Sequence, residues 1–242
     1  MVDWIIEVIS SYKYSEAAFF TAVRIMDTFF QRCTVPHKSS DLHLVGVASI
    51  FIACKYEEIY PLKVKLIHEK IAHRKLSRED IIRKESEIMA VLEFDLVGVN
   101  NFELLEHTLY THEIREKLEP RHFAYLEKIT LYLSKMVMFD VELLGTYTYS
   151  TLTAACIYVA FKIIEQVDPD FSSEDQVHAR SIQIKSIMAT LRQENKEAMD
   201  AAAKVLALAK SFDKEHPTLT NLRKFNGFTQ AGDGSLTERP TN

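Results

Sequence analysis

The chain has 242 residues, of which 47% are hydrophobic and 26% charged, with only 6 Gly and 6 Pro. This composition is that of a folded protein poor in turns, and it favours helices over sheets. With 29 Lys and Arg against 34 Asp and Glu, the net charge of -5 argues against nonspecific binding to nucleic acid.

Helical spacing of apolar residues dominates the first hundred residues. Ser15 precedes one helical run, Ser77 with Asp80 resembles a capping box, and Pro61 suits a first helical turn. We therefore expect five helices before Gly98, near residues 2–12, 15–33, 40–57, 62–72 and 78–93.

The segment from Leu42 to Pro61 is the most informative part of the chain. Its apolar residues cover every side of the expected helix, so other helices should enclose it. It ends abruptly in Lys55-Tyr56-Glu57-Glu58. Carboxylates are disfavoured at the negative pole of a helix dipole, so helix propensity does not explain this end.

A repeat supports a second copy of the same unit. A shift of 107 residues lays Ala48–Lys55 on Ala155–Lys162 with similar size and polarity at nearly every step. The alternative is that any two buried helices share apolar residues. We expect an all-α fold of two tandem five-helix units, residues 1–98 and 99–215, with an extended or disordered tail over 216–242. Helices of the second unit are expected near 101–112, 120–138, 149–166, 180–192 and 195–212.

The location of the chain is predicted from its cysteines and its apolar runs. Cys33, Cys54 and Cys156 are odd in number and far apart, which predicts free thiols in a reducing compartment. No apolar run reaches the ~18 residues of a membrane span, and the first residues carry acids where a signal peptide carries bases. We expect an intracellular protein that binds no membrane and no nucleic acid.

The sequence lacks the usual enzyme motifs. The only Gly-x-Gly, Gly232-Asp233-Gly234, lies in the tail with no strand before it. No H-E-x-x-H or paired-cysteine motif occurs, and the pairs His68/His73 and His107/His112 have a spacing that turns them apart on a helix. We expect no catalytic residue, no metal site and no cofactor.

A cluster of cations lies between Pro61 and Lys84, where eight bases face three acids. The pattern favours a solvated face of two helices over a surface for an acidic or phosphorylated partner. The bases are Lys63, Lys65, Lys70, Arg74, Lys75, Arg78, Arg83 and Lys84.

The first helix, MVDWIIEVIS, is apolar around most of its circumference. That is more apolar surface than one core face needs. Trp4 is therefore either a core residue or the floor of an exposed apolar groove for a peptide.

Four motifs, MVDWIIEV, LVGVA, CKYEEIYP and LEFDL, resemble the cyclin box of A- and B-type mitotic cyclins. The resemblance covers residues 1 to about 98, and continues weakly to about 215 through SKMVMFDVELL. The spacing from Cys33 to Pro36 leans slightly toward the B type without deciding the subtype. The resemblance implies a nuclear and cytoplasmic protein that activates a cyclin-dependent serine/threonine kinase and controls cell-cycle progression in mitosis.

The resemblance also implies which residues bind the kinase. In the family, the third and fifth helices grip the kinase C helix, and Lys55 and Glu85 match paired charges that hydrogen-bond the kinase backbone. The alternative is an internal structural ion pair. The other matching positions of this contact surface are Ile52, Tyr56, Glu57, Ile59, Met89, Phe94 and Leu96.

A second implied site is the family's groove for Arg-x-Leu type substrate or inhibitor peptides, matched by Met1, Trp4, Glu7, Leu42 and His43. His43 replaces a Gln familiar in A- and B-type cyclins. The competing function is a cyclin-fold scaffold or transcription-related adaptor that activates no kinase. DNA-binding relatives of that class need a basic face that spans both cyclin boxes, whereas the basic cluster here is confined to one box.

Overall fold

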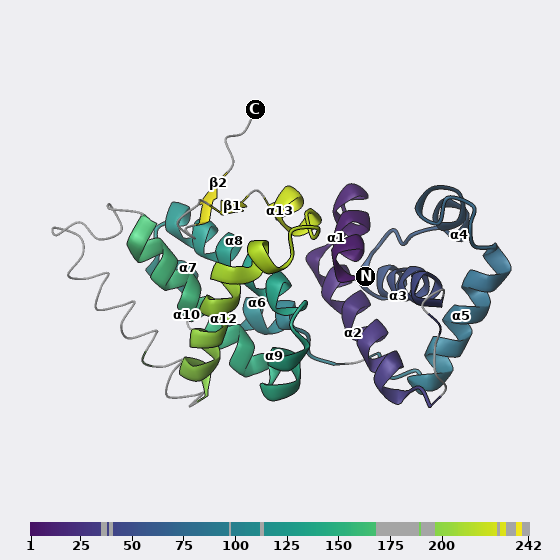
Figure 1. The fold of residues 1–242 in the computed structure, drawn as a ribbon, viewed down its shortest axis with the longest axis horizontal. Helices are drawn as coiled ribbons and strands as arrows, with labels where there is room; N and C mark the ends of the chain where they lie inside the picture. Colours follow the sequence, from purple (N-terminus) through teal and green to yellow (C-terminus); the bar gives the residue numbers. More distant parts are fainter. Residues whose placement is uncertain are drawn as a thin grey trace. The chain divides into compact units, whose positions relative to one another are not determined.

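The computed structural model describes the chain except residues 35–37, 39–40, 97, 112–113, 168–188, 190–196, 227, 231–235 and 239–242. It divides into two compact units, Met1–Asn100 and Asn101–Asn242. The first unit contains five α-helical segments and one π-helical turn among its described residues (Figure 1). They are α1 (Val2–Ser11), α2 (Glu16–Arg32), α3 (Asp41–Glu57), α4 (Val64–Leu66), the π-helix η1 (Ile67–Ile71) and α5 (Arg78–Val91).

Two serine caps fix the starts of helices in this unit, as the sequence predicts. The Ser15 hydroxyl accepts a hydrogen bond of 3.2 Å from the Ala18 N–H at the start of α2. The Ser77 hydroxyl accepts one of 3.0 Å from the Asp80 N–H at the start of α5. Each cap satisfies a backbone donor that the first helical turn leaves free, which is worth about 1 kcal/mol.

Helix α3 is the core helix of the first unit. Its residues from Val45 to Cys54 are all buried, and the helix packs against α2 and α5. Each large apolar side chain buried there contributes roughly 1.5–3 kcal/mol. The prediction that other helices enclose α3 is therefore confirmed. This packing sets the position of the charged C-terminal end of α3.

The fourth helix differs from its predicted form. The Ala72 N–H donates 2.8 Å to the Ile67 carbonyl, five residues earlier, which is the π-helical spacing. A left-handed turn follows, with φ of 48° at His73 and 62° at Arg74. Apolar periodicity over five residues does not distinguish the four-residue hydrogen-bond spacing of an α-helix from the five-residue spacing of a π-helix. The sequence therefore could not predict the π-helical turn.

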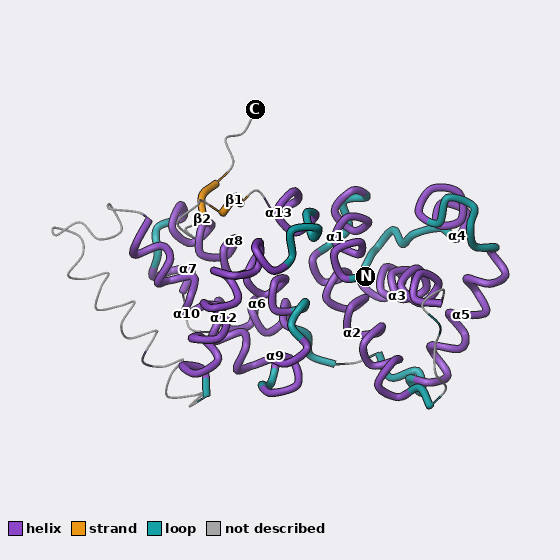
Figure 2. Tube along the Cα trace, in the orientation of Figure 1, coloured by secondary structure: helices purple, strands orange, loops and turns teal. Residues whose placement is uncertain are grey.

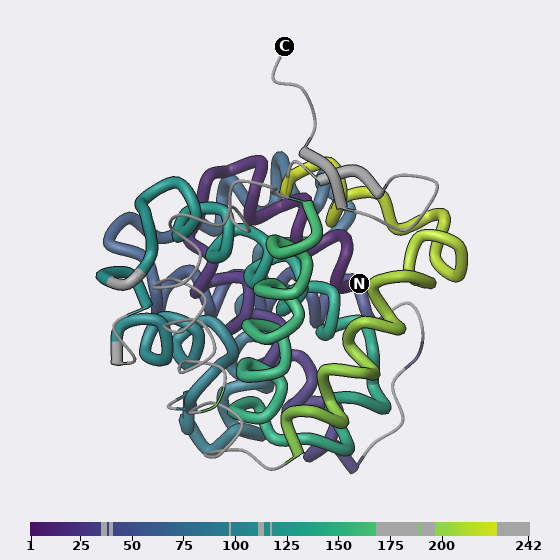
Figure 3. Tube along the Cα trace, turned by 90° about the vertical axis from the view of Figure 1, so that its left-hand side faces the viewer, coloured from purple at the N-terminus to yellow at the C-terminus, as the bar shows by residue number. Residues whose placement is uncertain are grey.

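The second unit is also built around a central helix. Helix α10 packs against α8, α12 and α6, and α12 runs alongside it (Figure 3). The predicted helix at 180–192 lies outside the described residues. The elements of this unit are α6 (Asn101–Thr111), α7 (Ile114–Lys117), α8 (Pro120–Val137), α9 (Val141–Thr146), α10 (Tyr149–Val167) and α12 (Ala198–Glu215).

Helix α10 corrects one expectation. It has 19 residues and is long and apolar enough to cross a membrane, although no such run was expected. Of its most apolar stretch, 67% is buried within the protein. The same apolar character that suits a bilayer here serves a core helix enclosed by its neighbours.

The tail is more ordered at its start than predicted. Helix α13 (Asn221–Asn226) is followed by strands β1 (Phe228–Gln230) and β2 (Leu236–Glu238), which pair antiparallel (Figure 2). The buried Lys135 ammonium of α8 donates 2.9 Å to the Asn226 side-chain oxygen, and Arg223 pairs with Asp213 at 2.9 Å. These contacts fasten the segment to the unit, and the short ribbon is an addition to the predicted all-α fold.

Candidate partner-binding surface

The two carboxylates at the end of α3 point back into the first unit. A carboxylate oxygen of Glu58 accepts 2.7 Å from the Ser15 backbone N–H, and one of Glu57 accepts 2.6 Å from the Thr21 hydroxyl. Ser15 is the N-cap of α2, where the helix dipole favours anions, and Thr21 lies in the second turn of the same helix. The two carboxylates are therefore stabilised by groups of α2, and Glu57, expected at the partner surface, has an internal role.

Lys55 lies differently from these carboxylates. Its ammonium pairs with the Glu85 carboxylate of α5 and lies 4.2 Å from the centroid of the Phe51 ring. The Lys55 side chain is 39% exposed and that of Glu85 18%. Partial desolvation lowers the pKa of Lys55 from its ordinary value. The two residues matched to the family's charges are thus neighbours, and they bridge α3 and α5 where solvent still reaches them.

Large apolar side chains next to these charges in the sequence are exposed. Tyr56 is 50% exposed and Ile59 88%, directly after Lys55, while Phe94 beyond α5 is 72% exposed. Met89 and Leu96 are half-buried. Ile52 is only 2% exposed, so its side chain belongs to the core of the unit and not to this surface.

The backbone around Phe94 holds its side chain outward. Glu93 and Phe94 have φ of 54° and 60°, a left-handed conformation that bulky residues rarely adopt. The Phe94 N–H donates 2.9 Å to the Met89 carbonyl, which anchors the turn to α5. Such strain costs on the order of 1–3 kcal/mol and clusters at functional sites.

Two further residues belong with this surface, although the resemblance did not assign them. Ile82 lies one turn before Glu85 on the same face of α5 and is 48% exposed, and Tyr60 is 85% exposed. The spacing of Ile82 from Glu85 was a usable signal in the sequence. We call the following set the docking face: Lys55, Tyr56, Ile59, Tyr60, Ile82, Glu85 and Phe94.

A second group of predicted residues meets between α1 and α3. The rings of Trp4 and His43 form an edge-on contact with centroids 5.2 Å apart. The Met1 side chain lies directly on the backbone of α3 at Gly46, where an added Cβ would meet its sulfur at 2.7 Å. Glu7 lies one turn after Trp4 and is half-buried, and Leu42 is 40% exposed. We call Met1, Trp4, Glu7, Leu42 and His43 the Trp4 surface. Trp4 itself is half-buried, so it contributes to the core and to this surface.

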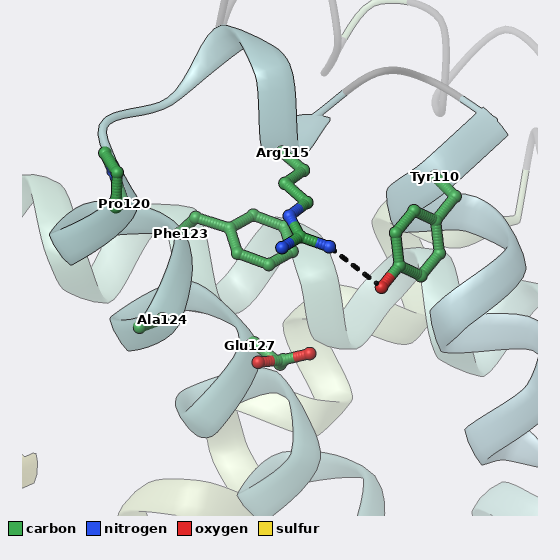
Figure 4. A pocket seen from close by; sticks show the side chains of 6 residues that line it. All are labelled: Tyr110, Arg115, Pro120, Phe123, Ala124 and Glu127. Atoms are coloured by element: carbon green, nitrogen blue, oxygen red, sulfur yellow. Dashed lines mark hydrogen bonds between the residues drawn. The ribbon is translucent and has the colours of Figure 1, made fainter.

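The structure offers no catalytic constellation among the residues it describes. Burial raises the pKa of Cys54 and Cys156 to about 12, so these thiols stay protonated and are not nucleophiles. Within the described ranges, no group of three metal-ligating side chains gathers. A pocket of about 480 Å³ in the second unit has Arg115 near the rings of Tyr110 and Phe123 (Figure 4). It pairs no nucleophile with a base.

Comparison with known proteins identifies the first unit. Residues 1–97 match the family model described as Cyclin, N-terminal domain. The first unit is a cyclin N-terminal domain. The relatives of this chain include A-type cyclins: it is 35% identical over 161 residues to cyclin-A1 of Xenopus laevis, and 31% identical over 164 residues to putative cyclin-A3-1 of Arabidopsis thaliana. These matches cover 65% and 68% of this chain but 35% and 44% of the relatives. The chain thus spans less than half the length of the relatives it matches.

Solved structures show the same fold. A viral cyclin from Herpesvirus saimiri superposes with a TM-score of 0.59 at 13% identity, covering 84% of this chain and 83% of that one. A chain of the CAK complex from Chaetomium thermophilum bound to ATP-γ-S gives a TM-score of 0.54 at 14% identity, covering 93% of this chain and 69% of that one. The fold predicted from the resemblance is confirmed as a mostly helical cyclin fold, and the relatives place the family membership with A-type mitotic cyclins.

Proposed function

We propose that this cyclin is the activating regulatory subunit of a cyclin-dependent serine/threonine protein kinase and that the docking face binds the kinase. It would control cell-cycle progression in mitosis, in the nucleus and cytoplasm, and could recruit substrates through the Trp4 surface. The observation that carries the proposal is the ion pair of Lys55 with Glu85, which bridges α3 and α5 beside exposed apolar side chains. The likeness to a chain of the CAK complex supports a cyclin working within a larger assembly.

The chemistry of the docking face suits a partner's backbone. An ammonium has three donors and a carboxylate about four acceptor positions, so one mutual hydrogen bond leaves both groups able to bind peptide N–H and C=O groups. The pair is close to neutral as a unit, which reduces the cost of covering it. Exposed aromatic and aliphatic residues such as Tyr56, Ile59 and Phe94 supply the apolar area that a stable interface needs.

The proposed action on the kinase is positional. Kinase activity requires the C-helix Glu to pair with the strand Lys that holds ATP phosphates, and the position of that helix controls activation. A rigid face built on two packed helices can hold the C helix in the active position. This cyclin then contributes no reacting group of its own and acts by binding the active form of its partner.

Co-expression with candidate cyclin-dependent kinases tests this proposal. We expect one of them to co-purify with the chain and to phosphorylate a histone-type substrate. Lys55→Ala and Glu85→Ala should each weaken the complex by about tenfold or more, about 1.4 kcal/mol. The melting temperature of the free chain should change little, because a half-exposed ion pair contributes at most about 1 kcal/mol to stability.

Lys162 offers a matched control, because it is the repeat counterpart of Lys55 in the second unit. Its ammonium pairs with Glu165 on the same helix at 2.7 Å, and this pair does not bridge two helices. Lys162→Ala should leave the complex unchanged. If no kinase forms a complex, the scaffold or transcription-related adaptor replaces this proposal. If Lys55→Ala lowers folding and binding in parallel, the ion pair is structural only.

A further inference from the structure

The bend that exposes Phe94 is tied to α2 by two arginines of that helix. The Arg32 guanidinium donates 3.3 Å to the Leu92 carbonyl, and Nη2 of Arg24 donates to the Leu96 carbonyl. Phe94 lies between these two carbonyls in the sequence and has a left-handed backbone. The bend is therefore held on both sides of the exposed ring. We call Leu92–Leu96 the Phe94 bend.

The guanidinium of Arg24 also lies directly against the backbone of Gly98. An added Cβ at Gly98 would meet Nη1 of Arg24 at 2.5 Å and its Cζ at 3.1 Å. The backbone of Gly98 is not left-handed, so glycine provides space there and not a special conformation. A guanidinium carries its nitrogens in a rigid planar fork. One nitrogen of Arg24 thus holds the Leu96 carbonyl while the other fits against the chain at Gly98.

Arg24 is poorly placed for stability alone. In the part of the chain that the structure describes, no carboxylate pairs with its guanidinium. Its Nε is buried and has no hydrogen-bond acceptor among the same residues. Burying an unmatched donor of a charged group lowers the free energy of unfolding. The hydrogen bond that Arg24 does make is to the backbone of the Phe94 bend.

We propose that Arg24 is a positioning residue of the docking face, which holds Phe94 turned outward before the kinase binds. The inference rests on the proposed function, because the kinase is the partner that meets Phe94. Left-handed backbone at Glu93 and Phe94 is disfavoured in a free chain, so the bend relaxes when its tie to α2 is lost. A side chain that is already in place loses less conformational entropy on binding, and the binding-competent fraction of the chain is larger.

A double-mutant cycle tests whether Arg24 acts through Phe94. Arg24→Met removes the donors and keeps an unbranched stem, and binding is measured by surface plasmon resonance with the kinase that co-purifies with the chain. We expect Arg24→Met to weaken binding by about fivefold or more in the parent chain, and by less than about twofold in a Phe94→Ala chain. An equal loss in both backgrounds would overturn the inference, because Arg24 would then act on the fold as a whole.

Gly98→Ala is a second variant that leaves every donor of Arg24 in place. The new Cβ pushes the guanidinium away from the backbone, since the end of the Arg24 side chain can move. We expect the same pattern of losses as for Arg24→Met. Gly145→Ala is the matched control, because a Cβ there meets nothing within 4 Å, and it should bind the kinase as the parent does. Unchanged kinase affinity in Gly98→Ala would overturn the inference.

Hydrogen exchange on the free chain tests the same hold without a kinase. The N–H groups of Phe94 and Asp95 donate 2.9 Å to the carbonyls of Met89 and Leu92. In Arg24→Met these two amides should exchange about tenfold faster or more, while the amides of α3 stay protected. Unchanged exchange at Phe94 and Asp95 would overturn the inference even if kinase binding falls. If no kinase binds the parent chain, the proposed function fails, and exchange alone decides whether Arg24 holds the Phe94 bend.

Discussion

The Thr21 hydroxyl of α2 donates a hydrogen bond of 2.6 Å to the Glu57 carboxylate at the end of α3, and accepts one of 3.3 Å from the Asn100 side-chain amide. Glu58, the next residue, accepts from the Ser15 N–H. The acidic end of α3 is therefore a cap on α2, while Lys55, two residues before Glu57, faces outward. The structural role of Glu57 and the proposed partner-binding role of Lys55 thus lie within one helical turn.

Removing the Glu57 carboxylate should destabilise the first unit. Glu57→Ala leaves the largely buried Thr21 hydroxyl without this acceptor, and the free energy of unfolding should fall by about 1–3 kcal/mol. Urea unfolding followed by circular dichroism measures this change. Glu106→Ala, at an exposed position of α6, is the control and should stay within about 0.5 kcal/mol of the parent. A stable Glu57→Ala chain that no longer binds a kinase would instead return Glu57 to the docking face.

The sequence predicted much of this arrangement, and its failures have physical reasons. Caps at Ser15 and Ser77 and the enclosed helix α3 follow from local chemistry and periodicity, so they were predictable. The inward orientation of the Glu57 side chain was not predictable, because the sequence pattern does not show where the start of α2 lies. Ile52 was placed on the partner surface by resemblance, yet a helix apolar on every side gives no signal of which face is covered.

Exchanging the charges of the bridge should separate its two roles. Lys55→Glu with Glu85→Lys keeps an ion pair between α3 and α5, so the free energy of unfolding should stay within about 1 kcal/mol of the parent. The donor and acceptor offered to the partner are now reversed. We expect kinase binding in a pull-down to remain lost in the double variant. Recovery of binding would mean that the bridge matters only as a structural link.

Asp27 of α2 should make stability depend on pH. Burial raises its pKa from 3.8 to about 6, so the folded protein holds this proton more tightly than the unfolded chain does. Stability from this group is therefore present below about pH 4, is lost as the pH rises through about 6, and stays lost above it. Asp27→Asn should stabilise the chain at pH 7.5 by as much as about 3 kcal/mol and by less at pH 5. Urea unfolding at both pH values checks this, and Asp95→Asn in an exposed loop is the control.

The ammonium of Lys135 should hold the start of the C-terminal segment on the second unit. It is 2% exposed and donates 2.9 Å to the Asn226 side-chain oxygen. Asn226→Ala removes that acceptor from a buried charge, so the local free energy that holds α13 should fall by about 1–3 kcal/mol. Hydrogen exchange should speed up in Asn221–Asn226 while α8 and α10 stay protected. Exchange that rises equally throughout the second unit would show that the contact stabilises the whole unit.

Gly46 should matter for the Trp4 surface more than for folding. An added Cβ would meet the Met1 sulfur at 2.7 Å, and that sulfur belongs to a flexible side chain that can move. Ala also favours a helix interior over Gly by about 0.8–1 kcal/mol, so Gly46→Ala should leave the melting temperature unchanged or slightly higher. Displacement of Met1 should alter the surface beside Trp4 and weaken the binding of an Arg-x-Leu type peptide in fluorescence polarisation. Gly145→Ala, where an added Cβ meets nothing within 4 Å, is the control and should bind the peptide normally. A Gly46→Ala chain with unchanged affinity would show that Met1 takes no part in binding, and the peptide would then depend on the other residues of the Trp4 surface.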